Sequence, residues 1–569
     1  MSPLFIAIVV IMAVLAILGI VVGVANDAIN FLNSAIGSKV APRRVILWIA
    51  AAGILIGTLT SSGMMEVARS GVFYPGQFSF SEIMMLFLGM MLGNVLLLDL
   101  YNTLGLPTST TVSMVFGLLG AAVATALFRI AADPSFSLHD LSQFINTGKA
   151  MVIIAAILVS VVFAFAAGTL FMYISRLIFS FRYHPAFRRW GAFWCGISLS
   201  GILYFALFKG LKSSGLIPSD ITQYVGEHVL LTLFAFWAAA SLILWILQRM
   251  RFNIMRITIL SGTFALALAF AGNDLVNFIG VPVAGFDAYS IAHRTGDASM
   301  LMGALNENVP ANFLVLLAAG GVMIATLWTS KKSMHVSATE LSLSTQSDEG
   351  SEQQYGSSFF SRTIVRAALN INAGVERVIP RRLRTAIAKR FEYEDIEHSG
   401  APYDMIRATV NLTTSALLIA LATSLKLPLS TTYVSFMVAM GSSLADRAWG
   451  RESAVYRISG VMTVVAGWFV TALGGFLIAF VVGLALIYGG IPAFVLITLL
   501  CGYMIVHSNF LKKNKEAAAT TRRAETNEDI IAGLRDEVCS TMENATRIYD
   551  RTLIAVFKEN RKVLRDMVK

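Results

Sequence analysis

The heptapeptide ANDAINF at residues 25–31 recurs as GNDLVNF at residues 272–278, and LPTSTT at residues 106–111 recurs as LPLSTT at residues 427–432. Each acid-amide heptapeptide follows a long apolar run, and each proline-hydroxyl string separates two further apolar runs. Polar residues at such depth in a membrane are costly, so they indicate function. The duplication therefore predicts one site built from two related parts of the chain.

Composition identifies the solvent. Hydrophobic residues make up 56% of the chain, charged residues only 14%, and the mean hydropathy is +0.70, which excludes a water-soluble globule. Thirteen apolar runs, most of them about 20 residues long, predict an all-α polytopic membrane protein. The run 431–446 is short enough for a half-helix. The runs lie near 3–25, 43–62, 82–100, 111–129, 149–175, 191–210, 229–249, 253–272, 310–330, 405–427, 431–446, 458–486 and 489–507.

Basic residues between the runs predict the orientation. They gather in the odd-numbered gaps, after the first, fifth, seventh and eleventh runs, as at Arg43, Arg176, Arg251 and Arg451. Such gaps belong in the cytoplasm, so the N-terminus is expected outside and the C-terminus in the cytoplasm. The net charge of +10 is thus mostly topological, and it does not indicate a nucleic-acid partner. The partner that the chain requires is the lipid bilayer.

Two hydrophilic segments are expected to be cytoplasmic. In the loop 331–404, residues 333–358 read as a disordered linker. Residues 359–391 alternate basic and apolar side chains, which fits either a helix lying on an anionic leaflet or a solvated tether. The tail 508–569 carries an apolar stripe at helical spacing, which predicts helices that need a partner surface.

The spacing of the motifs predicts inverted repeats. The two acid-amide pairs end runs one and eight, and an odd separation reverses the direction through the membrane. Ser109 follows Asp27 by 82 residues and Ser430 follows Asp274 by 156, and the excess of 74 equals the length of the loop 331–404. The predicted parts are the first repeat at 1–129, connecting helices at 130–252, the second repeat at 253–330 and 405–507 with the last spans, the loop at 331–404 and the tail at 508–569.

Broken or re-entrant helices are expected at the proline-hydroxyl strings. Proline ends the preceding helix, and serine or threonine caps the apolar helix that follows. A half-helix N-terminus inside a membrane presents free N–H groups and the positive end of a dipole, which suits an anion. Two such termini, one from each repeat, could converge on one tetrahedral oxyanion. Inverted repeats with broken helices are typical of secondary transporters.

The two carboxylates predict coupling. Asp27 and Asp274 would repel an anion in a medium of low dielectric constant, so a cation or a proton must intervene. Hard oxygen ligands without cysteine or a nearby histidine favour an alkali ion over a transition metal. Phosphate fits better than sulfate, because a carboxylate can accept the hydrogen of a protonated phosphate.

These motifs also resemble a known family. The strings GVANDAIN at 23–30 and AGNDLVN at 271–277 are similar to the paired GANDVANA signatures of the inorganic phosphate transporter (PiT) family, and the proline-hydroxyl strings to its GLPVSTTH elements. The resemblance covers about residues 1–330 and 405–507. It implies a secondary transporter, not an enzyme, that imports inorganic phosphate with sodium ions or protons by alternating access. It also implies no cofactor besides the coupling ion, and a bacterial inner (plasma) membrane as the location.

The resemblance assigns roles at matching positions. It implies that Asp27 and Asp274 bind the cation, with sodium as the expected metal ion, and phosphate together. The amides and the hydroxyls would then contact the cation and the anion. The cation-binding amides are Asn26 and Asn273, and the phosphate-binding residues are Asn30, Asn277, Ser109, Thr110, Thr111, Ser430, Thr431 and Thr432.

Departures from the family pattern leave alternatives open. The histidine that commonly follows the hydroxyl triplet is Val112 in one copy and Tyr433 in the other, which weakens a proton relay and leaves the coupling ion open, with sodium favoured over a proton. A symporter of sulfate or another oxyanion is the main alternative. An anion channel would not need two carboxylates, and a membrane-embedded phosphatase lacks a histidine or a Lys-Arg cluster beside the motifs. A homodimer is a further arrangement that the sequence leaves open.

Overall fold

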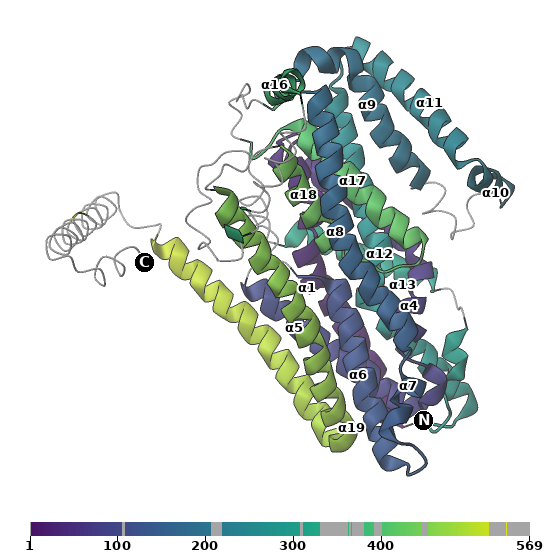
Figure 1. Ribbon diagram of the computed structural model, residues 1–569. Coiled ribbons are helices and arrows are strands. Elements are labelled where there is room, and N and C mark those ends of the chain that lie inside the picture. The colour runs from purple at the N-terminus through teal and green to yellow at the C-terminus, as the bar shows by residue number, and fades with distance from the viewer. Residues whose placement is uncertain are drawn as a thin grey trace. The chain divides into compact units, whose positions relative to one another are not determined.

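The computed structural model describes residues 2–104, 108–205, 219–307, 311–330, 380–391, 401–446 and 453–522, with 362, 363, 366 and 542. This part of the chain is helical, and its only extended pairing is two isolated bridges, Phe73 with Ile145 and Ser79 with Leu301 (Figure 1). The helices are α1 (Pro3–Asp27), α2 (Ile29–Gly37), α3 (Arg43–Leu59), α4 (Glu66–Ser70), α5 (Phe80–Leu104), α6 (Thr110–Ala132), α7 (Leu141–Phe144), α8 (Thr147–Ile178), α9 (His184–Tyr204), α10 (Ser219–Glu227), α11 (Val229–Arg249), α12 (Ile254–Thr295), α13 (Phe313–Thr329), α16 (Arg381–Arg390), α17 (Met405–Ser424), α18 (Thr431–Ala445) and α19 (Ser453–Arg522).

The chain divides into two compact units, Met1–Cys501 and Gly502–Lys569. The predicted linker 333–358 and most of the predicted basic segment and tail lie outside the described residues. Within the basic segment, α16 is described, and its side chains at Arg382, Arg384, Lys389 and Arg390 are exposed. The fold and the site described below belong to the first unit.

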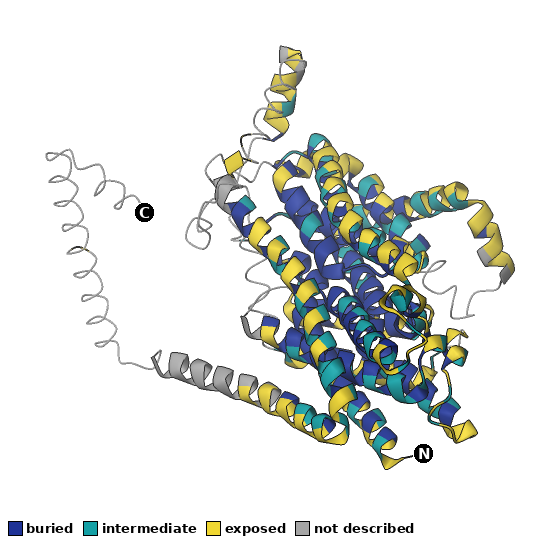
Figure 2. Cartoon of the chain, turned by 60° about the horizontal axis from the view of Figure 1, so that its bottom comes forward, coloured by how far each residue is buried: buried dark blue, intermediate teal, exposed yellow. Residues whose placement is uncertain are grey.

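The helices confirm an integral membrane protein. Eight helices in the described part of the chain are long and apolar enough to cross a membrane, and α3 with the bent segment Ser61–Ser70 makes a ninth candidate. The outward faces are exposed and apolar, as at Val162 of α8, which is 69% exposed (Figure 2). A bilayer is the medium that covers such a surface.

Thirteen separate full spans are not what the structure shows. Each apolar run falls on a helix in the described part of the chain, but α18 has 15 residues, too few for a full crossing, and α13 has 17, at the lower limit. The last two runs lie on two helices that share the label α19 and meet at Gly490, where the backbone leaves the helical region with a φ of 54°. The half-helix expected at 431–446 corresponds to the short α18.

The acid-amide pairs end apolar runs, as the sequence shows, but the helical path of the backbone continues past both of them. Asn273 and Asp274 sit midway along the 42 residues of α12. Asp27 is the last residue of α1, but Ala28 keeps helical angles and α2 follows at once. The apolar run stops at these residues because their side chains turn into a buried polar site, while the backbone stays helical.

Each proline-hydroxyl string separates the two helices of a hairpin, as the sequence predicts. In the first hairpin α5 and α6 are neighbours, and in the second α17 and α18 are neighbours. Ser109 and Ser430 are the N-cap residues of α6 and α18. Residues 105–107 of the first string lie outside the described residues. Each hairpin tip thus carries a helix N-terminus formed by a hydroxyl triplet.

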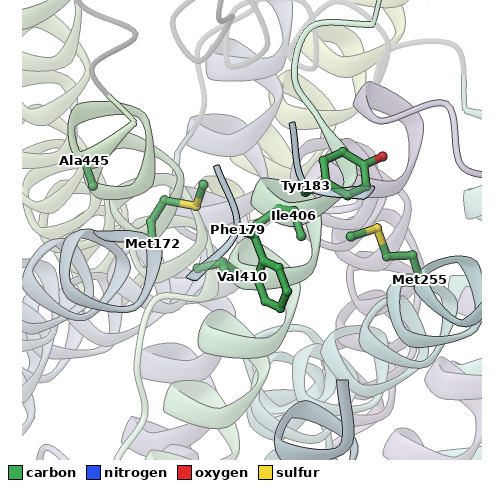
Figure 3. Packing of buried hydrophobic residues seen from close by; sticks show 7 residues of the cluster. All are labelled: Met172, Phe179, Tyr183, Met255, Ile406, Val410 and Ala445. Atoms are coloured by element: carbon green, nitrogen blue, oxygen red, sulfur yellow. The ribbon is translucent and has the colours of Figure 1, made fainter. Parts of the chain in front are cut away.

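The bases of the two hairpins lie at opposite ends of α12. Phe80, at the beginning of α5, donates its backbone N–H to the carbonyl of Met300, just after α12 ends. Ile406, at the beginning of α17, packs in a buried apolar cluster with Met255, at the beginning of α12 (Figure 3). The hairpins therefore enter from opposite ends, and their tips meet beside Asp274, in the middle of α12.

Charged groups tie each hairpin at its base. In the first hairpin Arg129 of α6 donates to Glu82 of α5 at 2.8 Å. In the second, Arg176 of α8 donates to both carboxylate oxygens of Asp446 at 2.6 and 2.9 Å, and to Asp404 at 2.9 Å. The first pair is partly exposed, whereas the side chains of Arg176 and Asp446 are completely buried.

Glycines let the second hairpin approach α8 closely. A Cβ atom at Gly168 of α8 would lie 2.5 Å from the carbonyl oxygen of Val438 on α18. A Cβ atom at Gly441 of α18 would lie 2.3 Å from the carbonyl oxygen of Phe165 on α8. Only glycine fits where two helix backbones come so near, so this contact fixes α18 against α8.

Candidate functional site

All twelve residues that the sequence singles out meet in one buried cluster. None of them is more than 4% exposed. The α1–α2 segment contributes three of them, α12 three, and each hairpin tip three. In that order they are Asn26, Asp27 and Asn30; Asn273, Asp274 and Asn277; Ser109, Thr110 and Thr111; and Ser430, Thr431 and Thr432.

Asp27 joins the two hairpin tips. Its Oδ2 accepts a hydrogen bond of 2.9 Å from the hydroxyl of Thr110, the first residue of α6. Its Oδ1 accepts another of 2.9 Å from the hydroxyl of Thr432, in the first turn of α18. One carboxylate therefore holds helix N-termini from both halves of the chain.

Asp274 does the same from the opposite copy of the motif. Its Oδ1 accepts from the hydroxyl of Thr111 at 2.8 Å, and its Oδ2 accepts from the hydroxyl of Thr431 at 2.5 Å. The amides of Asn277 and Asn273 also donate to Oδ1, at 2.7 and 3.2 Å. Each oxygen of this carboxylate is therefore held by the protein.

Asn30 and Asn277 occupy equivalent places in the two copies. The amide of Asn30 donates to the hydroxyl of Thr432 at 3.0 Å, and the amide of Asn277 donates to that of Thr111 at 2.9 Å. The Oδ1 atoms of both asparagines are buried and accept no hydrogen bond within the described part of the chain. Amide oxygens of this kind are hard ligands, which suit an alkali or alkaline-earth cation.

The contacts of one copy correspond to those of the other. Each aspartate binds the first threonine of its own hairpin and the second threonine of the other hairpin. Each asparagine binds the second threonine of the other hairpin. The contacts made by the threonines are therefore symmetric, although the duplicated strings stand hundreds of residues apart.

The two serines of the site cap helices. The hydroxyl of Ser109 accepts from the backbone N–H of Val112 at 3.2 Å, and that of Ser430 accepts from the N–H of Tyr433 at 3.2 Å. The remaining N–H groups of each first turn keep the tip electropositive. Capping confirms the local structure that the strings predict.

The first asparagine of each pair braces a hairpin tip. Asn26 Oδ1 accepts from the backbone N–H of Thr108 at 3.1 Å, and the amide of Asn273 donates to the carbonyl of Leu429 at 2.7 Å. Both partners immediately precede a capping serine. In this structure these amides position the tips.

The site combines negative carboxylates with positive helix ends. The two carboxylates interact electrostatically, and their hydrogen-bond partners are hydroxyls and amides rather than basic side chains. Within the described residues, no group of three or more His, Cys, Asp and Glu side chains is placed to hold a metal ion. The polar groups that the site does bring together are mixed oxygen donors and helix N-termini.

Helix α19 supports the first tip through residues that the sequence analysis does not single out. The hydroxyls of Thr108 and Thr471 share a hydrogen bond of 2.7 Å. The hydroxyl of Tyr101 donates to the carbonyl of Gly467 at 3.1 Å. Thr108 stands directly before the first hydroxyl triplet and could have been identified, but Thr471 lies in an ordinary apolar run and carries no sequence signal.

Comparisons with known proteins bear on the family and the fold of the chain. The profile of the phosphate transporter family matches residues 23–361. A provisionally named phosphate permease of Thermococcus kodakarensis is 27% identical over 317 residues, which are 53% of this chain and 69% of that protein. One of Pyrococcus abyssi is 28% identical over 318 residues, again 53% and 69%. The solved structure of a sodium-dependent phosphate transporter covers 84% of this chain and 98% of its own, with a TM-score of 0.57 and 16% identity, which shows a shared fold.

Proposed function

This chain belongs to the phosphate transporter family, and on that premise we propose that it is a secondary active transporter importing inorganic phosphate together with a cation, sodium rather than a proton. Membership makes it an integral membrane phosphate transporter and not an enzyme. The coupling ion, the direction and the mechanism are the proposed part.

The observation that carries the proposal is the double bridging of the hairpin tips by Asp27 and Asp274. Two helix N-termini converge there, and together they provide N–H groups, hydroxyls and positive dipole ends for a tetrahedral anion. The carboxylates sit within the same cluster and oppose an anion that arrives alone. Phosphate binding is therefore expected to require a positive partner.

Sodium satisfies this requirement with the donors that are present. The carboxylates of Asp27 and Asp274 and the amide oxygens of Asn30 and Asn277 offer hard oxygen ligands. A cation held by them would cancel the repulsion of the anion, so each ion would raise the affinity for the other. The residue after each hydroxyl triplet is Val112 in the first copy and Tyr433 in the second, so neither copy has a histidine there to relay a proton. This supports sodium as the coupling ion.

We also propose that the two halves are inverted repeats that alternate in access. The opposite entry of the hairpins and the corresponding contacts of the site support this relation. In the structure the site is buried from both ends, which is consistent with an occluded state. Arginines in the last turns of α8 and α11 support a cytoplasmic position for the C-terminal ends of these helices. The N-terminus is then outside, and the membrane is proposed to be the bacterial inner (plasma) membrane.

Uptake of radiolabelled phosphate into proteoliposomes tests the coupling. With the purified protein, an inward sodium gradient is expected to drive accumulation, whereas an inward proton gradient without sodium is expected to leave it at the level of protein-free vesicles. The physical reason is that sodium can neutralise the buried carboxylates while it contacts the anion.

Other outcomes would overturn separate parts of the proposal. Accumulation driven by protons alone would make Asp27 and Asp274 proton carriers instead of sodium ligands. Sulfate uptake without phosphate uptake would overturn the substrate. Phosphate flux that follows only its own gradient, with no dependence on either cation, would indicate a channel.

The threonine hydroxyls are expected to matter more than the threonine methyl groups. Thr431→Ala removes a hydroxyl that donates to a carboxylate, and it should lower the initial uptake rate roughly tenfold or more, since such bonds are among the strong ones. Thr431→Ser keeps the hydroxyl and should stay within about threefold of wild type.

Thr125→Ala is the matched control for Thr431→Ala. Thr125 is also buried, but its hydroxyl donates only to the carbonyl of Ala121 in its own helix. Uptake by this variant should remain near wild type. Equal losses in Thr431→Ala and Thr125→Ala would show that the hydroxyl acts through helix packing and not through the site.

A further inference from the structure

Tyr433 has a buried hydroxyl with no hydrogen-bond partner among the residues that the structure describes. It is the residue after the second hydroxyl triplet, in the first turn of α18, and its side chain is 3% exposed. Leaving a buried donor unpaired destabilises the folded protein. A group retained at that cost beside a ligand site points to a partner that arrives with the ligand.

The ring of Tyr433 is held in one orientation. It stacks on Trp468 of α19 with ring centroids 3.8 Å apart and an angle of 19° between the planes. Phe436 packs edge-on against the same tryptophan, at 5.8 Å and 83°. The outer side of this stack lines an apolar cavity of about 410 Å³, whereas the hydroxyl oxygen itself is covered by protein.

The neighbours of Tyr433 explain why the protein alone does not satisfy its hydroxyl. The side chain interacts electrostatically with Asp27, but both oxygens of that carboxylate already accept from Thr110 and Thr432. It also interacts with Tyr101, whose own hydroxyl donates to the carbonyl of Gly467. The Tyr433 hydroxyl is therefore next to the site, oriented by a stack, and without an acceptor.

We propose that the hydroxyl of Tyr433 donates a hydrogen bond to the transported oxyanion and so selects it. This inference rests on the proposed transport function and adds a residue to its site. The anion brings acceptor oxygens to the tips of the hairpins, and a phenol donates well to a charged oxygen.

The proposal makes the two halves of the site unequal. The equivalent residue of the first half is Val112, which has no donor. The anion is therefore bound nearer to the second tip, beside Thr432 and Asp27, than to the first. This asymmetric position favours an anion that turns an unprotonated oxygen toward Tyr433 and a protonated oxygen toward a carboxylate. A fully ionised sulfate has no protonated oxygen and therefore fits less well.

Tyr433→Phe tests the proposal because it removes only the oxygen and keeps the ring on Trp468. In proteoliposomes the KM for phosphate should rise roughly tenfold or more, while the maximal rate at saturating phosphate changes little, because a bond to bound substrate is lost. Binding of radiolabelled phosphate to the purified variant should weaken by the same factor. Tyr433→His keeps a hydrogen-bond donor, so its KM for phosphate should lie between those of wild type and Tyr433→Phe.

Tyr403→Phe is the matched control. It also removes a buried tyrosine hydroxyl, but that hydroxyl donates to the carbonyl of Asn33 at 3.0 Å and belongs to neither hairpin tip, so the KM for phosphate should stay within about threefold of wild type. Retained tryptophan fluorescence and an unchanged melting temperature would show that the Tyr433→Phe variant is folded.

The outcomes separate this inference from the function on which it rests. Wild-type protein that neither binds nor transports phosphate would overturn the proposed function. Phosphate transport by wild type together with an unchanged KM in Tyr433→Phe would overturn only the role of Tyr433. A lower maximal rate with unchanged KM and unchanged binding would also overturn it, since it would assign the hydroxyl to a conformational step.

Discussion

Replacing Asp27 or Asp274 by asparagine is expected to lower the initial rate of phosphate uptake by roughly a hundredfold or more in each variant. A full charge about 4 Å from a cation is worth roughly 4 kcal/mol at the effective dielectric constant of protein sites, and asparagine removes it. Without the cation, nothing offsets the repulsion between the anion and the remaining carboxylate. Both copies are needed, because each aspartate joins both hairpin tips.

The asparagine variants should nevertheless fold. The partners of Asp27 are two threonine hydroxyls, which can donate or accept, so an asparagine amide can take the place of one carboxylate oxygen. At Asp274, only the hydroxyl of Thr431 contacts Oδ2, so the amide nitrogen can take that side. The loss of uptake would then report on charge and not on the structure of the tips.

The measurement is initial uptake of radiolabelled phosphate at equal amounts of reconstituted protein, with melting temperature as the check on folding. Asp133→Asn is the control, since Asp133 is the C-cap residue of α6, at the end of that helix opposite to the hydroxyl triplet. Its uptake should match wild type. Uptake within about threefold of wild type in either Asp27→Asn or Asp274→Asn would remove these residues from the site.

The candidate site could be predicted from sequence because its residues carry two independent signals. Each acid-amide pair and each hydroxyl triplet interrupts an apolar run, which is costly in a membrane, and each recurs with a consistent offset. The N-caps at Ser109 and Ser430 followed from local chemistry, since proline and hydroxyl residues punctuate helices wherever they occur. Because both signals point to one site, all twelve residues were expected to lie close together, and the structure places them in one buried cluster.

Helix continuity could not be predicted in the same way. An apolar run stops either where a helix ends or where a helix turns polar side chains toward a buried site, and hydropathy does not separate the two. Asn273 and Asp274 lie in the second situation, within the long α12. The length of a run was more informative, because the short run 431–446 predicted the half-helix that the structure shows as α18.

Contacts across the bundle had no local signal at all. Thr471 and Trp468 of α19 look like ordinary residues of an apolar span, yet one binds the first tip and the other stacks on Tyr433. Such roles depend on which helices pack together. The glycines Gly168 and Gly441, which set one of those packings, are equally unremarkable in a membrane sequence rich in glycine.

The buried charge cluster at the base of the second hairpin leads to the other large expected effect. Arg176→Met should lower the free energy of unfolding by about 3–5 kcal/mol, because it leaves the completely buried Asp446 and the partly buried Asp404 without their main cationic partner. Arg407, whose Nε lies 3.2 Å from Asp446, compensates for the lost charge only in part, because it does not replace the bidentate contact between Arg176 and Asp446. The expected readout is a lower midpoint of thermal unfolding in detergent.

Arg129→Met is the matched comparison, since Arg129 forms an ion pair with Glu82 at the base of the first hairpin. Its partner Glu82 and Arg129 itself are 16% and 26% exposed, so water can solvate what remains, and the loss should be about 1 kcal/mol or less. Equal shifts in the two variants would mean that burial does not distinguish the two bases. A second variant separates charge from packing: in Arg176→Met combined with Asp446→Leu, two buried charges disappear together, and the midpoint should recover toward wild type. Recovery would locate the cost of Arg176→Met in an unpaired buried carboxylate, and its absence would locate that cost in the lost contacts of the arginine side chain.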